Sequence, residues 1–321
     1  MITGTSKGKR SYINIILGVL AAVCFSILIS NGSVVTKAVA EGLRAAFLTV
    51  MPSTFPYMVL SSVMISSGVF EKTGRIFSPL AKLFDLPDGC MFVIPMSLVC
   101  GFPVGAAAVG RLYAEGRCSR EEGERLAAFC NFCGPPYILG VFASAVESYR
   151  GAVIAYITQS ILALIFGIVL AKTGGRKRKE DEKEPRVSGG ADGINKEGLS
   201  SVICHAVCTS GYKYMNTVFY IVFFSVICSA AGKMLPFLPR PLLGFLELTY
   251  GISGLNTIKN KAARYFFGCA IIYFSGASVH FQVISILEKP LSAGKYMITR
   301  IIFFPVCSAL ATFAALILGA L

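Results

Sequence analysis

Twenty consecutive residues, 152–171, read AVIAYITQSILALIFGIVLA and carry no charge. An apolar helix of about 20 residues is long enough to cross the hydrocarbon core of a bilayer. Residues 12–30, YINIILGVLAAVCFSILIS, are also uncharged, and residues 297–321 carry one charge, Arg300. The 321-residue chain is 55% hydrophobic, with a mean hydropathy of +0.68. These features predict an all-α polytopic membrane protein and argue against a soluble domain.

The amino-terminal apolar run is preceded by basic residues, as in a signal peptide. The run is long, however, and no clear Ala-x-Ala cleavage site follows it. We therefore expect an uncleaved first membrane span.

Basic residues give the chain a formal net charge of +13. The excess of Lys and Arg in cytoplasmic loops of membrane proteins explains this charge, so we expect no nucleic-acid partner. Lys172 and the run RKRK at 176–179 directly follow an apolar span, which predicts a cytoplasmic end; binding to anionic lipid heads is the alternative. Residues 173–198 are charged, rich in Gly and free of aromatic residues, which predicts a flexible cytoplasmic linker.

The linker separates two halves that resemble each other. Residues 56–68, PYMVLSSVMISSG, resemble residues 219–232, FYIVFFSVICSAAG. Each half then contains two Gly-rich interruptions, CGFPVGA and NFCGPPYIL in the first half and YGISGL and YFSGASVHF in the second. Three matches in the same order indicate a duplication. The predicted organisation is an N-terminal transmembrane helix (1–33), a first repeat (34–172), the linker (173–198) and a second repeat (199–321).

The charge pattern also predicts how the halves enter the membrane. A basic amino terminus on the inside places the start of the first half outside, and the basic linker places its end inside. The second half then begins inside. Similar halves that enter from opposite sides are inverted repeats, the plan of many secondary transporters. The sequence therefore predicts a transporter with two inverted repeats and broken or re-entrant helices.

The first interruption, CGFPVGA, is a candidate substrate site. Unwound backbone within a bilayer is tolerated only inside protein or beside a water-filled cavity. Pro103 removes a helix donor, and Gly101 and Gly105 loosen the chain around it. Helix is expected to resume at about Val104, where free amides suit an anion. A proline kink for packing and close helix contact at the glycines are the alternatives.

The second interruption follows a predicted short helix. Ser119 and Glu122 have the spacing of a capping box that opens this helix. We expect it to end near Asn131, because Gly134 and Pro135 cannot continue it. Asn131 can both donate and accept hydrogen bonds, so it is a candidate substrate contact at the tip of a broken helix.

Two cysteines in this interruption form a CxxC pair, Cys130 and Cys133. A structural zinc site needs about four ligands, and the obvious second pair is missing; a site completed by Cys204, His205 and Cys208 is the alternative. A redox motif would need a βαβ context that is absent. Apolar packing is therefore favoured, and no metal is expected.

The second half carries different polar groups. Glu247 is the only acid between Lys233 and Glu288 and lies in apolar sequence with Gly251 close behind it. An intramembrane carboxylate is a functional hypothesis by default. It could carry a coupling proton, bind a cation such as Na⁺ or pair with Arg240; a solvated group near the interface is the alternative.

The last interruption places several polar residues in an apolar run, among them His280, which could respond to protons near neutral pH or be hydrogen-bonded in the core. No HExxH, GxSxG or paired-acid motif is present, so we expect no enzymatic activity, no catalytic residue and no cofactor beyond a coupling H⁺ or Na⁺. The full predicted substrate site is Gly101, Pro103, Gly105, Asn131, Gly134, Pro135, Glu247, Gly251, Ser275, Gly276, Ser278, His280 and Gln282.

These motifs resemble a known family. CGFPVGA, the following YAEGRCSREEGERLAAFCNFCGPPYILG, and LELTYGISGL with SGASVHFQVISIL are similar to sporulation integral membrane proteins of the YlbJ type, which carry the nucleoside-recognition Gate domain. The resemblance runs from about residue 43 to the carboxyl terminus, except the linker, and makes the two repeats Gate-like. Family members typically read Ser-Gly-Tyr/Phe-Pro-x-Gly-Ala and Cys-Asn-Asn/Thr-Ser-Gly-Pro. Here Cys100, Phe132, Cys133 and Pro136 depart from those patterns and remove polar groups from the implied site.

The resemblance implies an architecture similar to concentrative nucleoside transporters. It also implies residence in the outer forespore membrane or cell membrane of an endospore-forming bacterium, and movement of dipicolinate from the mother cell towards the forespore. Asn131, Ser275, Ser278 and Gln282 are then expected partners of the dipicolinate carboxylates.

Other charged residues have less direct roles under the same resemblance. Arg111 and Arg125 would either draw the anion from the cytoplasm or be solvated loop charges. Glu247 would repel a dianion and is expected to carry a proton or cation. A nucleoside-like or other metabolite transporter, a non-transporting scaffold for spore-envelope assembly and a homo-oligomer are the alternatives that stay open.

Overall fold

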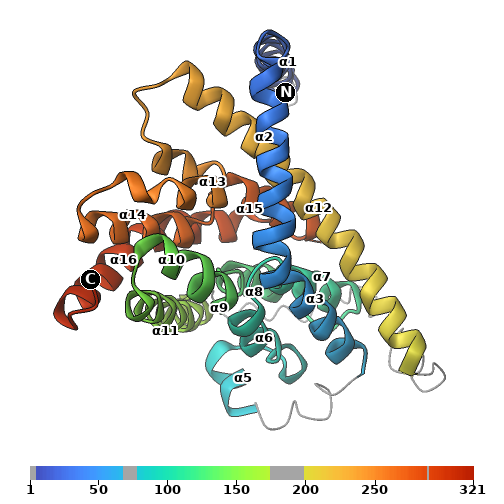
Figure 1. Ribbon diagram of the computed structural model, residues 1–321. Coiled ribbons are helices and arrows are strands. Elements are labelled where there is room, and N and C mark those ends of the chain that lie inside the picture. The colour runs from blue at the N-terminus through green and yellow to red at the C-terminus, as the bar shows by residue number, and fades with distance from the viewer. Residues whose placement is uncertain (1–4, 68–77, 174–198, 288) are drawn as a thin grey trace.

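The computed structural model describes residues 5–67, 78–173, 199–287 and 289–321. These residues are helical and contain no β-strand (Figure 1). Five of the described helices are long and apolar enough to cross a membrane: Gly32–Met64, Tyr149–Thr173, Ser200–Met234, Lys261–Ile286 and Gly294–Ile317. The predicted all-α polytopic class is confirmed. The predicted linker lies outside the described residues, apart from Thr173.

The chain opens with α1 (Thr5–Ser30), which leads into a long rod. The rod consists of α2 (Gly32–Arg44), the π-helical η1 (Ala45–Val50) and α3 (Met51–Ser66). In Figure 1, α1 is viewed along its axis at the upper end of α2, so the two helices meet at a steep angle.

The rod packs along α12 (Leu199–Met234). A Cβ at Gly42 would lie 3.1 Å from the Val222 Cα, so glycine allows a close approach of the two helices. Farther along, the Tyr214 hydroxyl donates to the Ala46 carbonyl at 2.6 Å. These contacts fix α12 against the rod at the level of the π-helical turn.

The first half is a series of short helices before one long one. Its elements are α5 (Ser78–Phe84), η3 (Asp88–Cys90), α6 (Val93–Cys100), α7 (Val104–Ala114), α8 (Arg120–Phe129), α9 (Pro135–Tyr137), η4 (Ile138–Phe142), α10 (Ala143–Val146) and α11 (Tyr149–Thr173). Both predicted interruptions are present, at 101–103 and 130–134, and helix resumes at Val104 as expected. The Ser119–Glu122 capping box is also confirmed.

The second half follows α12. Its elements are η6 (Arg240–Phe245), α13 (Leu248–Ser253), η7 (Leu255–Thr257), α14 (Lys261–Phe274), α15 (Gly276–Ile286) and α16 (Gly294–Ile317). Within the interruption predicted at 250–255, α13 ends at Ser253 with Gly254 as its C-cap, but Gly251 lies inside the helix; a further break lies at 246–247. Glu247 caps α13 by accepting the Tyr250 N–H, so the helix starts at Leu248, before the predicted interruption.

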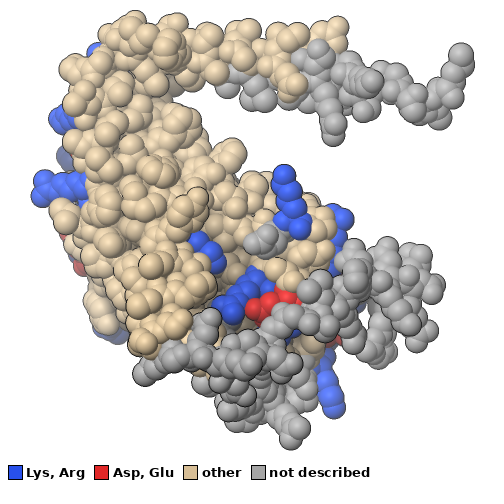
Figure 2. Space-filling view, turned by 90° about the vertical axis from the view of Figure 1, so that its right-hand side faces the viewer, with Lys and Arg blue, Asp and Glu red and all other residues tan. Residues whose placement is uncertain are grey.

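The core lies where α8, α11, α14 and α16 meet. Two tyrosines of α14 tie it to α11: the Tyr265 hydroxyl donates to the Gly151 carbonyl at 2.8 Å, and the Tyr273 hydroxyl donates to the Ala155 carbonyl at 2.9 Å. Uncharged residues cover most of the face that Figure 2 shows, as expected for helices in contact with lipid. The broken helices lie between this core and the rod with α12.

Candidate functional site

The two interruptions of the first half touch each other. The Phe102 backbone N–H donates to the Phe132 carbonyl at 2.7 Å. Gly101 has φ of +70°, and a Cβ there would overlap the backbone of Gly134. A Cβ at Gly105 would overlap the Cys130 carbonyl. The predicted glycines therefore act by letting two unwound segments approach each other.

The second half joins its interruptions in the same way. The Ser278 backbone N–H donates to the Leu246 carbonyl at 2.9 Å. Ser275 and Gly276 have φ of +78° and +72°, and this left-handed turn separates α14 from α15. Gly251 faces Gly244 so closely that a Cβ would overlap it. Each half thus links its two breaks by one backbone hydrogen bond.

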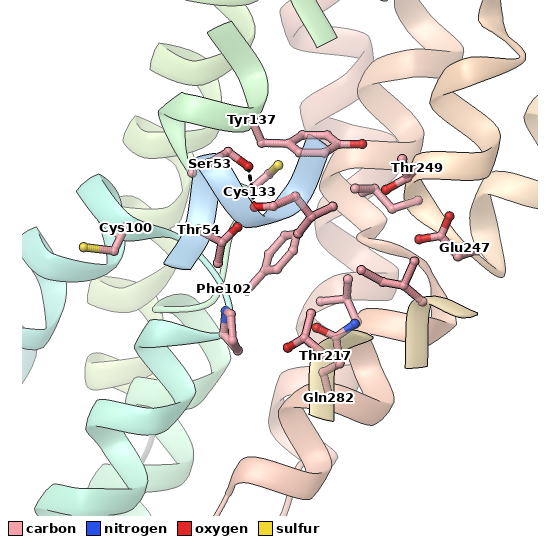
Figure 3. Close-up of a pocket in the computed structure, with 16 residues that line it drawn as sticks. Ser53, Thr54, Cys100, Phe102, Cys133, Tyr137, Thr217, Glu247, Thr249 and Gln282 are labelled. Atoms are coloured by element: carbon pink, nitrogen blue, oxygen red, sulfur yellow. Dashed lines mark hydrogen bonds between the residues drawn. The ribbon is translucent and has the colours of Figure 1, made fainter. Parts of the chain in front are cut away.

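A small pocket lies between the breaks of both halves, α3 and α12 (Figure 3). Its cavity volume is about 30 Å³, which is room for one or two water molecules. In Figure 3, Ser53 and Thr54 lie across the pocket from Glu247 and Thr249. The polar side chains that line it are Ser53, Thr54, Tyr137, Thr217, Glu247, Thr249 and Gln282, and no Lys or Arg is among the 16 described lining residues.

Glu247 is the charged group of this pocket. It is 2% exposed and forms no ion pair with a described residue. Its carboxylate accepts the Tyr250 backbone N–H at 2.6 Å and caps α13. Glu247 lies outside the five candidate spans, and burial raises its pKa to about 7, although hydrogen bonds from Tyr250 and Thr249 lower it. Arg240, a possible partner, instead stacks 4.3 Å from the Tyr250 ring centre.

The chain resembles known proteins in two comparisons. Residues 47–176, from η1 to just past α11, match the family model described as Gate: Nucleoside recognition. These residues, which we call the Gate domain, are similar to that family. The chain is 26% identical over 287 residues to the sporulation integral membrane protein YlbJ of Bacillus subtilis (strain 168). The aligned region covers 85% of this chain and 62% of that protein.

The resemblance predicted from the motifs is therefore confirmed. The chain spans less than two thirds of the length of this relative. No solved structure matches the chain. Together with the five apolar helices, the similarity to an integral membrane protein identifies a multi-pass membrane protein.

Four of the thirteen predicted site residues line the pocket: Pro103 and Gly134 from the Gate domain, and Glu247 and Gln282 from the second half. Six others shape the breaks without lining it, namely Gly101, Gly105, Pro135, Gly251, Ser275 and Gly276. Asn131, Ser278 and His280 are buried away from it.

The three buried polar residues outside the pocket each have a nearby partner. The Asn131 amide donates to the Ala127 carbonyl at 2.8 Å, and the Ser278 hydroxyl accepts from the amide of Gln282, a pocket residue, at 3.2 Å. His280 Nδ1 lies 2.9 Å from the Tyr296 hydroxyl on α16. His280 therefore belongs to a hydrogen-bonded contact with α16 in this conformation.

Sequence reasoning missed the pocket hydroxyls Ser53, Thr54, Thr217 and Thr249, because single Ser and Thr residues in apolar helices give no local signal. It also missed Gln159 of α11, which is fully buried and donates to the Cys133 carbonyl at 2.9 Å. This bond fixes the tip of the Gate domain, residues 130–134, against α11.

The two arginines expected to draw in an anion do not line the pocket. Arg111 pairs with Glu115 at 2.7 Å. Arg125 is 6% exposed and binds the Asp85 carbonyl, so it is not a solvated loop charge. Both arginines have structural partners in the Gate domain.

The CxxC thiols are both buried, and Cys133 lines the pocket. Cys204 and Cys208 are exposed on α12. Within the part of the chain that the structure describes, no group of three or more His, Cys, Asp or Glu side chains could hold a metal ion. The chemistry available at the pocket is hydrogen bonding and proton exchange at Glu247.

Proposed function

We propose that this protein is a membrane transporter that carries a small organic anion, with dipicolinate as the leading candidate, through the pocket between its two halves. The observation that carries the proposal is the position of Glu247, a buried carboxyl group without an ion-pair partner among the described residues, in a pocket lined by broken helices of both halves. Burying such a carboxyl group costs free energy, and this cost makes a functional role the default explanation for its presence.

The pocket is closed in this conformation. A cavity of about 30 Å³ cannot hold an aromatic acid, so substrate entry requires the tip or the opposing break to move. Each half joins its breaks by a single backbone hydrogen bond, Phe102 to Phe132 and Ser278 to Leu246. The parallel construction supports two inverted repeats that move against each other around a fixed site, as in concentrative nucleoside transporters.

The lining suits a small aromatic acid when Glu247 is protonated. The rings of Phe102 and Tyr137 line the pocket and offer faces for stacking. Hydroxyl groups and the Gln282 amide can donate to carboxylates. A neutral Glu247 would donate another hydrogen bond, whereas an ionised Glu247 would repel the anion. Protonation would therefore couple uptake and release to the proton gradient, with Na⁺ as the alternative coupling ion.

The name of the relative supports a place in sporulation, with the outer forespore membrane or cell membrane as the location. The competing substrate is a nucleoside or another neutral metabolite, which the Gate description and the absence of Lys and Arg from the described pocket lining favour. From another class, a non-transporting scaffold, with or without homo-oligomer formation, would leave Glu247 with only its structural role as the N-cap of α13.

The test is uptake into proteoliposomes that contain the purified full chain. Labelled dipicolinate and labelled uridine are supplied separately, under an inward H⁺ gradient, an inward Na⁺ gradient or none. We expect saturable dipicolinate uptake that needs the H⁺ gradient and stops with a protonophore. Uptake of uridine alone would favour the nucleoside carrier, and uptake of neither by folded protein would overturn a transport function for these substrates.

A further inference from the structure

Arg300 is a buried charge that the pocket does not use. It lies on α16 and is 1% exposed. Its Nη1 donates to the Tyr273 carbonyl at 3.3 Å, whereas Nε and Nη2 have no hydrogen-bond partner among the described residues. It also forms no ion pair within that part of the chain. An arginine stays protonated in proteins, so some other feature must compensate this charge.

Aromatic rings supply part of the compensation. The guanidinium carbon lies 5.2 Å from the ring centre of Phe132, 5.4 Å from that of Tyr296 and 5.9 Å from that of Phe303. The faces of such rings attract a cation. Phe132 belongs to the tip at 130–134, so Arg300 holds this tip directly.

Helix ends supply the rest. Tyr273 is in the last turn of α14, and the tip begins at Cys130, the C-cap of α8. The carboxyl end of a helix carries a partial negative charge. The Arg300 guanidinium therefore lies between the carboxyl end of α14, through the Tyr273 carbonyl, and the tip that follows α8, through the Phe132 ring.

We propose that Arg300 is a positioning residue whose charge clamps the 130–134 tip to the end of α14 and keeps the tip closed over the pocket. Cys133 and Gly134 of the tip form one wall of the pocket, so releasing the clamp opens it. Gln159 holds the same tip from α11 through a neutral hydrogen bond. This inference rests on the proposed transport function and adds to it, because it assigns to Arg300 the control of how often the pocket opens.

The first experiment measures tip opening without substrate, so it stands apart from any failure of transport. Hydrogen–deuterium exchange of the full chain in nanodiscs is followed for peptides that cover 126–138. We expect Arg300→Gln to speed exchange there about tenfold and Arg300→Lys, which keeps the charge, about twofold. Thr299→Val is the matched control, since Thr299 is buried beside Arg300 on α16 and donates only to the Lys295 carbonyl of its own helix.

A second measurement covers the case in which Arg300→Gln does not fold. Phe132→Leu removes the tip ring but leaves the charge and is expected to speed exchange of 126–138 about threefold without changing α14. Unchanged exchange in Phe132→Leu and in any folded Arg300→Gln protein would overturn the proposal. Equal effects of Lys and Gln, or an equal rise throughout α12, would also overturn it, because either result assigns Arg300 a packing role only.

Discussion

The Glu247 carboxylate accepts the backbone N–H of Tyr250 at 2.6 Å, so the acid of the pocket is also the N-cap of α13. This bond holds the carboxyl group in one orientation at the pocket wall. It also stabilises the ionised form against the cost of burial, and the pKa of Glu247 near 7 reflects both effects. A group of this kind can change its charge near neutral pH while staying in place.

The first prediction concerns the pH dependence of transport. The Glu247 carboxyl group is neutral below its pKa of about 7 and charged above it, so uptake of the anion should fall as pH rises through about 7. Glu247→Gln is neutral at every pH and should lose this dependence together with coupling to the proton gradient. Initial rates of dipicolinate uptake between pH 5.5 and 8.5, as roughly bracketing values, test both points.

Glu121→Gln is the control for this series. Glu121 is half-exposed on α8, 4.0 Å from Lys295, so its replacement should leave the pH profile unchanged. A wild-type profile that is flat across this range, or a Glu247→Gln protein that keeps the wild-type profile, would remove the proton-carrier role.

The second prediction concerns Gly101. Its φ of +70° disfavours other residues, and a Cβ there would overlap the Gly134 backbone. Gly101→Ala should therefore destabilise the fold by more than about 1 kcal/mol and lower the melting temperature of the purified protein. Gly211→Ala is the matched control, because Gly211 lies within α12 with open space around it. That substitution should be neutral or slightly stabilising, and equal melting temperatures for the two variants would contradict the close approach.

Much of the fold follows from local signals in the sequence. Apolar runs predicted two of the five candidate spans, Tyr149–Thr173 and Gly294–Ile317. The Gly-Pro clusters predicted the breaks after Cys100 and at 130–134, because proline and glycine act on their own backbone. In the second half, Gly251 was expected in an unwound turn but lies inside α13, where it packs against Gly244. A glycine that unwinds a helix and a glycine that allows close packing look alike in the sequence.

The candidate site was less predictable than the fold. Glu247 was found because an acid in apolar sequence is conspicuous, and it does line the pocket. Arg300 was noticed only as the single charge of the last span. Its proposed role depends on contacts with Phe132 and Tyr273, which are far from it in the sequence. Whether an isolated Ser or Thr faces a pocket or its own helix depends on how distant helices pack.

The last prediction concerns one of these hydroxyl groups, that of Thr217. It lines the pocket from α12, is 3% exposed, and its Oγ1 has no hydrogen-bond partner among the described residues. A buried hydroxyl without a partner costs about 1–3 kcal/mol, so Thr217→Val should leave stability unchanged or raise it. If this hydroxyl donates to substrate, the same change should raise the KM for dipicolinate about fivefold with little effect on kcat, because a contact made equally before and during translocation affects binding alone.

Melting temperatures measure the stability of the Thr217→Val protein, and uptake at a series of dipicolinate concentrations measures its KM. Thr299→Val again serves as the control, because the Thr299 hydroxyl is bonded within its own helix. An unchanged KM in Thr217→Val would place the substrate away from α12, whereas a lower melting temperature would mean that the hydroxyl has a structural partner.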